Sequence, residues 1–283
     1  MKTMTYLSIL IALFLCHCLY GQQIQGIATY KSQRKFDVQL DSTMTDAMQE
    51  QIRAMLKKQS EKEFTLEFTE GESEYKEVQK LDDDGVFESG GMKIVVAGSG
   101  GNDVYYKNLK ENRYTNKTEV FGKEFLIKDA LEARDWKLEK ETKNIGEYTC
   151  FKATYNTTRT IMTAESDSER DPKDNTSMVE EEPITITAWY TPQIPLQHGP
   201  SEYDGLPGLI LEVNDGSETI LCSKLVLNPE KGISIKEPVK GKEVTEAEYR
   251  AILDAKMKEM NEQFEGDGRK KEGGNRMQIR IGG

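Results

Sequence analysis

A short segment near residue 205 sets the tightest limit on how this chain can fold. It reads Gly205-Leu-Pro-Gly208, and Leu209 to Val213 follow at once as a run of β-forming residues. Glycine adopts positive φ angles readily, whereas Pro207 fixes its own φ and biases Leu206 toward extended backbone. The segment therefore predicts a constrained turn that leads directly into a buried strand. It contains no side chain suited to catalysis.

Strand-like segments separated by short turns run along most of the chain. Asn214-Asp-Gly216 is a strong hairpin signal between two of them. Consecutive strands at such short spacing indicate an antiparallel sheet. The expected strands are 23–30, 63–69, 73–81, 93–97, 103–109, 113–120, 123–127, 136–143, 147–157, 184–190, 209–213 and 218–227.

Two helices are expected beside the strands. Apolar residues at spacings of three and four predict a helix over 42–61. Thr245 and Glu248 form a capping box ahead of an amphipathic run, which predicts a second helix over 245–264. Strands in sequence with two separate helices indicate the α+β class. We expect a strongly curved antiparallel sheet or an incomplete barrel, with one or both helices covering its open face.

The N-terminus is typical of an exported protein. Lys2 precedes an apolar run from Tyr6 to Leu15, and Gly21 is a small residue suited to cleavage, so residues 1–21 are interpreted as a secretory signal peptide. No later apolar run approaches the length of a membrane-spanning helix, so no transmembrane segment is expected in the mature chain. The predicted location is the periplasm or the outer membrane.

The remainder is predicted to be one α+β domain over residues 22–265. Two segments, 82–102 and 159–182, are expected to be mobile insertions. The first is rich in aspartate and glycine, and few side chains of the second could repay the entropy of ordering. The Gly-rich, basic tail over 266–283 is expected to be disordered. The net charge of −11 makes nucleic acid an unlikely partner, because like charges repel.

Few residues of the mature chain are suited to catalysis or metal binding. His198 is its one histidine, and Cys150 and Cys222 are its two cysteines, which are too few for the usual zinc ligands. The two cysteines either pair as a disulfide between neighbouring strands or remain buried thiols. No catalytic residue, metal site or cofactor is predicted.

The segment from Gly205 to Ile210 matches the signature for which the GLPGLI family is named, and the chain resembles that family. Lys143 to Ala153, Trp189 to Pro195 and His198 to Pro200 resemble the family's flanking segments. The resemblance implies a secreted envelope protein of Gram-negative bacteria with no established activity. It also implies that Gly205, Leu206, Pro207, Gly208, Leu209 and Ile210 form a structural motif.

Apolar residues around this motif are the candidate binding site. Trp189, Tyr190, Leu206 and Leu209 form either part of the core or the rim of an apolar groove. We expect Trp189 to face inward and Tyr190 to share the opposite face of its strand with Ile186. The favoured function is non-enzymatic binding of an apolar small molecule, a peptide or an envelope protein. The alternatives are an accessory protein whose edge strand pairs with an outer-membrane protein, and a carboxylate-dependent hydrolase.

Overall fold

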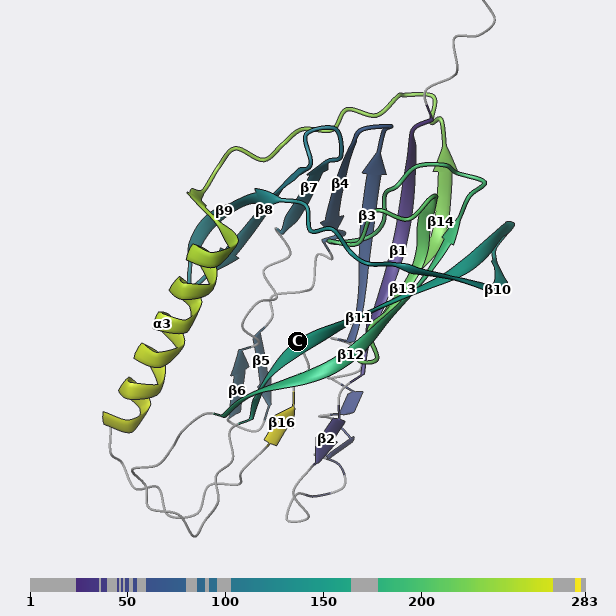
Figure 1. Ribbon diagram of the computed structural model, residues 1–283. Helices are drawn as coiled ribbons and strands as arrows, with labels where there is room; N and C mark the ends of the chain where they lie inside the picture. Colours follow the sequence, from purple (N-terminus) through teal and green to yellow (C-terminus); the bar gives the residue numbers. More distant parts are fainter. Residues whose placement is uncertain are drawn as a thin grey trace, which may run out of the picture.

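A large antiparallel sheet forms the body of the protein (Figure 1). The computed structural model describes residues 24–35, 37–39, 60–79, 86–89, 92–95, 103–163, 178–266 and 278–280, with scattered positions between 45 and 54. Within these residues, twelve strands form one sheet in the order β10-β11-β12-β13-β14-β1-β3-β4-β7-β8-β9-β15. The strands β10 and β15 are its two edges, so the sheet is not closed into a barrel.

The strands largely follow the expected positions. The sheet consists of β1 (Gly26–Arg34), β3 (Glu61–Phe68), β4 (Glu72–Glu77), β7 (Val104–Asn108), β8 (Arg113–Val120), β9 (Lys123–Ala130), β10 (Lys137–Ile145), β11 (Tyr148–Thr163), β12 (Met178–Thr191), β13 (Leu209–Asn214), β14 (Glu218–Leu227) and β15 (Lys242–Val244). Two separate antiparallel pairs lie outside it, the β5 (Val86–Ser89) and β6 (Met92–Val95) hairpin and the pair of β2 (Asp37–Gln39) with β16 (Gln278–Arg280). Only β15 joins its neighbour, β9, in parallel.

The main core shows how strongly the sheet curves. Cys150 on β11 and Tyr75 on β4 belong to one buried cluster, although five strands separate β11 from β4 in the sheet order. Tyr30 and Phe68 fill the middle of this cluster and are buried. Strands so far apart can share a core only if the sheet bends around it. The expectation of a curved, open sheet is therefore confirmed.

The C-terminal helix α3 spans Glu246–Gly266, close to the expected range. Its capping box forms as predicted: the Thr245 amide donates to the Glu248 carboxylate at 2.8 Å, and the Glu248 amide donates to the Thr245 hydroxyl at 3.2 Å. Tyr249 and Ile252 of α3 pack against Phe125 of β9. The helix therefore lies along the β9 side of the sheet (Figure 1) and does not cover the whole open face.

The helix expected over 42–61 falls mostly outside the described residues. Ala47, Gln49 and Glu50 are helical, and the Gln49 amide donates to the Thr45 carbonyl at 3.0 Å, as in an α-helix. The signal peptide 1–21 lies wholly outside the described residues. The described residues are thus mainly β-strand, and α3 is the one helix that they define from end to end.

Three segments expected to be mobile or disordered contain strand, and one of them, 82–102, contains both β5 and β6. β11 continues to Thr163 and β12 begins at Met178, with Arg159 opposite Glu182, so both ends of the 159–182 insertion extend a hairpin. Cross-strand pairing satisfies backbone donors and acceptors that a loop would leave to water, and this outweighs the polar composition. The tail is likewise not wholly irregular, because β16 pairs with β2.

Candidate functional site

Residues 192–208, here called the strap, connect β12 to β13 and cross the curved sheet. Lys107 on β7 is fully buried beneath the strap. Its ammonium donates hydrogen bonds to the carbonyls of Gly199, Ser201 and Tyr203 at 3.0, 2.8 and 2.8 Å. An ammonium has three donors, so Lys107 is fully hydrogen-bonded. Burial lowers the pKa of Lys107 to about 8.

His198 fastens the strap at a second point. Its side chain is fully buried, and Nε2 lies 3.0 Å from the Thr69 carbonyl in the turn between β3 and β4. Because a carbonyl only accepts, Nε2 carries the proton and the buried Nδ1 is left without a partner. Burial, with the nearby Lys107 charge, lowers the pKa of His198 to about 3. The neutral ring therefore anchors the strap to the turn between β3 and β4.

A third anchor joins the strap to the segment before β10. The Arg134 guanidinium lies 3.6 Å from the Asp204 carboxylate, and both side chains are almost completely buried. The Trp136 indole donates to the Asp204 carbonyl at 2.9 Å. Burial raises the pKa of the Asp204 carboxyl, one of whose oxygens has no hydrogen-bond partner among the described residues. The strap is held by buried polar groups on both sides.

Both motif glycines are required, but for different reasons. Gly205 has a φ of +85°, which residues with a side chain rarely adopt, although an added Cβ would meet no atom within 4 Å. Gly208 lies so close to β12 that an added Cβ would fall 2.2 Å from the Thr191 carbonyl oxygen. The constrained turn expected from the sequence is therefore present. Its second glycine is needed for close backbone approach and not for positive φ.

The structure gives the predicted contact residues a packing role. Leu206 and Leu209 are fully buried, and Tyr190 is nearly so. Tyr190 and Ile186 share one core cluster, whereas Trp189 packs against the other, as expected from alternation along β12. The Lys143 ammonium covers the Trp189 ring at 4.4 Å from its centre. None of these four candidate residues lines either of the cavities described below.

The two cysteines do not lie on neighbouring strands, so of the two alternatives left open by the sequence the structure has the unpaired thiols. Cys150 is on β11 and Cys222 is on β14, with β12 and β13 between them, and both thiols are free. The curved sheet nevertheless directs both side chains to the same core cluster. Burial raises the pKa of each thiol to about 11, so neither is a reactive thiolate near neutral pH.

An apolar cavity of about 360 Å³ lies between α3 and the sheet. One wall is formed by the turn between β8 and β9 and by the first residues of β9, including Phe121 and Phe125. The other wall is α3, which contributes Ile252 and Leu253. A volume of this size with apolar walls is typical of sites for small ligands.

Phe121 at the rim of this cavity has an unusual conformation. It occupies the turn between β8 and β9 with a φ of +52°, followed by Gly122 at +72°. Asn, Asp or Gly is favoured in such a turn, and a bulky side chain there is strained. The Phe121 side chain is also 48% exposed. An exposed aromatic ring in a strained turn contributes little to folding, which favours a role in contact with a ligand.

Positive charge surrounds the apolar walls. Lys123, Lys242 and Lys256 all line the cavity, together with the single acid Glu259. Lys256 contacts Glu259, whereas Lys123 and Lys242 form no ion pair with any residue in the described ranges. The cavity thus combines an apolar interior with a positively charged rim, in a protein whose net charge is negative.

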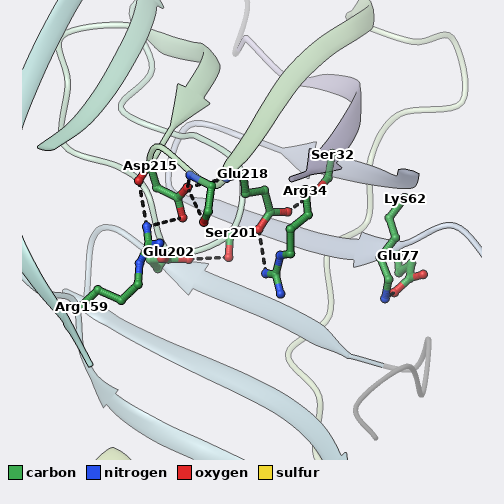
Figure 2. A network of polar contacts seen from close by, with 10 residues as sticks. Ser32, Arg34, Lys62, Glu77, Arg159, Ser201, Glu202, Asp215 and Glu218 are labelled. Atoms are coloured by element: carbon green, nitrogen blue, oxygen red, sulfur yellow. Dashed lines mark hydrogen bonds and ion pairs between the residues drawn. The ribbon is translucent and has the colours of Figure 1, made fainter. Parts of the chain in front are cut away.

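A second cavity, of about 330 Å³, lies beside the strap. Arg34, Glu202, Asp215 and Glu218 are among its lining residues, and Figure 2 shows how their side chains gather there. Arg34 pairs with Glu218 at 2.9 Å, and Arg159 lies 3.4 Å from Asp215. The described residues contain no group of three His, Cys, Asp or Glu side chains placed to hold a metal ion.

Sequence reasoning missed the anchors and both cavities. Lys107 and Arg134 lie in ordinary strand and loop contexts, and nothing local indicates that their charges are buried. Phe121 carried one available signal, because Phe-Gly is an unfavourable pair at a two-residue turn. Nothing in the described part of the chain forms a helix long and apolar enough to span a membrane.

Comparison with known proteins places part of the chain near a family without an assigned function. Residues 136–212 match a family described as "Protein of unknown function (Porph_ging)". The match runs from Trp136 through β10, β11, β12 and the strap to Glu212 in β13. It agrees with the expectation of an unassigned function, and the name GLPGLI itself does not occur in it. No curated protein compared with this chain matches it.

Two solved structures show a distant similarity. They are described as the structures of PNGF-II in the C2 and P21 space groups, with TM-scores of 0.46 and 0.45 and sequence identities of 15% and 14%. The alignments cover 82% and 81% of this chain but 33% of each PNGF-II chain, so this chain spans about a third of their length. Similarity at this level assigns no activity to the protein.

Proposed function

We propose that this protein is a non-enzymatic, exported binding protein whose ligand is an amphiphile with an apolar chain and an anionic head. The cavity between α3 and the sheet is the binding site. The observation that carries the proposal is the apolar cavity of about 360 Å³ with the exposed, strained ring of Phe121 at its rim. The acyl chain would lie against the apolar walls.

The charges at the rim select the head group. Lys123 and Lys242 lack ion-pair partners among the described residues and stand at the same opening. An anionic head there would gain favourable electrostatic interactions without breaking an existing ion pair. A cationic head would be repelled. The ligand class is therefore a fatty acid or a similar anionic amphiphile.

The experiment is calorimetric titration with dodecanoate, with dodecyltrimethylammonium as the cationic counterpart of equal chain length. Saturable binding of dodecanoate alone supports the proposal. Changing Lys123 and Lys242 together to Met should weaken dodecanoate binding by about tenfold, equivalent to about 1.4 kcal/mol. The control is Val239→Ser, which changes an apolar side chain that is 86% exposed and outside the cavity. Equal affinity for both amphiphiles would contradict the proposal.

Pairing of an edge strand with a partner protein has less support at β10. This strand carries alternating charges, among them Lys140 and Glu141, and its pairing with β11 is irregular between Leu138 and Thr142. Charges and irregular pairing on an edge strand are typical protections against pairing with another chain. Export itself is tested by the N-terminal sequence of the protein isolated from cells, which should begin near residue 22.

A further inference from the structure

The cavity beside the strap has features that the proposed function does not use. It is about 330 Å³ in volume and lies between the strap and the turn that joins β13 to β14. Three carboxylates line it, from Glu202, Asp215 and Glu218, against a single lining cation, Arg34. The lining therefore has an excess of negative charge.

The three carboxylates differ in the ion pairs and hydrogen bonds that they form. Glu218 pairs with Arg34 and accepts a hydrogen bond from Ser32 (Figure 2). Asp215 pairs with Arg159 and accepts hydrogen bonds from its own turn, including the Ser217 amide at 2.8 Å.

Glu202 differs from both. It accepts only from the neighbouring Ser201 hydroxyl, at 2.5 Å (Figure 2), and forms no ion pair with any residue that the structure describes. Glu202 is therefore the carboxylate available to an incoming group.

Aromatic rings form the apolar part of this cavity. Phe64 and Tyr75 stack with their ring centres 4.8 Å apart and their planes 11° from parallel. Tyr75 is 6% exposed, yet its hydroxyl makes no hydrogen bond to the described residues. Tyr75 lines the cavity together with Glu202 and Glu218. Burial, followed by the charges of Glu218, Glu202 and Glu77, raises the pKa of Tyr75. Tyr75 therefore brings a hydroxyl that is unpartnered among the described residues to the wall of the cavity.

We propose that this cavity is a second binding site, one that takes an organic ammonium group. The ammonium donates hydrogen bonds to the Glu202 carboxylate and to the Tyr75 oxygen, while its carbon chain packs on the rings of Phe64 and Tyr75. The described carboxylates are not arranged as a metal site, and the excess of negative charge disfavours an anion. The ammonium comes either from a free alkylamine or from a lysine side chain of a peptide.

The test is a titration of ¹⁵N-labelled protein followed by NMR. The probes are n-pentylamine, the capped amino acid N-acetyl-lysine amide, and 1-pentanol, which has the length of pentylamine without its charge. We expect saturable shifts of the Ser201 to Tyr203 amide signals with pentylamine and none with pentanol. A response to the lysine probe at lower concentration than to pentylamine identifies a peptide source, and the reverse order identifies a free amine.

Three variants decide the assignment. Glu202→Gln should weaken pentylamine binding about tenfold, and Tyr75→Phe, which keeps the ring, about threefold. Glu230→Gln, a change at an exposed acid outside the cavity, should have no effect. Unchanged affinity in Glu202→Gln, or equal shifts with pentanol, overturns the proposal. Dodecanoate binding is unaffected by these changes, so this test and that of the α3 cavity succeed or fail separately.

Discussion

The strap and the β8–β9 turn both contain energetically unfavourable groups, but these groups are compensated to different extents. Beneath the strap, carbonyls of Gly199, Ser201 and Tyr203 compensate the cost of burying the Lys107 ammonium. The Thr69 carbonyl compensates Nε2 of His198 in the same way. In the β8–β9 turn, Phe121 has a positive φ and a half-exposed ring that lines the α3 cavity, so burial offsets its strain only in part. Compensated groups indicate stability, whereas a group compensated only in part at a cavity indicates binding.

This difference can be tested first at Lys107. Lys107→Met removes the ammonium and leaves the three carbonyls of the strap buried without donors. We expect a loss of about 3–5 kcal/mol in the free energy of unfolding. Urea denaturation followed by circular dichroism measures it. Lys110→Met, at an exposed lysine in the next turn, is the control, and similar losses in both variants would contradict the anchoring role.

The two motif glycines should differ in how much stability each loses on substitution by alanine. Gly208→Ala forces a Cβ against the backbone of Thr191, which cannot move aside without disturbing β12, so we expect a loss of about 3 kcal/mol. Gly205→Ala meets open space and costs only the positive φ, about 1 kcal/mol. Thermal and urea unfolding of both variants check the order. A larger loss of stability for Gly205→Ala than for Gly208→Ala would show that the close approach of Gly208 to the Thr191 backbone is not what constrains the turn.

His198 should make the fold sensitive to acid. Its pKa is about 3 in the folded protein and near 6.5 when unfolded, so the unfolded state binds the proton first as pH falls. Stability from this group is complete above pH 6.5 and falls by about 1.4 kcal/mol per pH unit toward pH 3. At pH 4.5 the loss is about 2–3 kcal/mol relative to pH 7. His198→Gln should remove this part of the pH dependence, and an identical profile for the variant would exclude His198 as its source.

Phe121→Asn should have the smallest effect on stability and the opposite sign. Asparagine tolerates the positive φ of this turn, so we expect a gain of about 1 kcal/mol in the free energy of unfolding. Dodecanoate binding should weaken at the same time, because the aromatic contact at the cavity is lost. Denaturation and calorimetry on the same sample measure both. A variant that is less stable yet binds equally well would assign Phe121 to the fold.

Local patterns in the sequence predict most of the fold. The capping box at Thr245 and the turn at Asn214 are short-range signals, and α3 and the β13–β14 hairpin form where those signals lie. The extension of β11 to Thr163 was missed, because cross-strand pairing overrides polar composition. The separation of Cys150 from Cys222 was also missed, because strand order in a curved sheet depends on long-range contacts.

The candidate sites were less predictable than the fold. The conspicuous motif led to Leu206 and Leu209, which are buried, because glycine and proline record backbone constraints and say nothing about exposed surface. The α3 cavity joins Phe121 to Leu253, more than a hundred positions apart in the sequence. Such a juxtaposition depends on how α3 packs against β9, which no local pattern encodes.

The most direct test of the account is an NMR map of dodecanoate binding on ¹⁵N-labelled protein. If the α3 cavity is the site, the amide signals of Phe121, Gly122 and the Ile252–Leu253 turn of α3 shift with saturation. Signals of the strap and of Trp189 stay unchanged, because neither contributes to that cavity. Saturable shifts centred on the strap and Trp189, with α3 unaffected, would contradict the account and return the binding site to the motif.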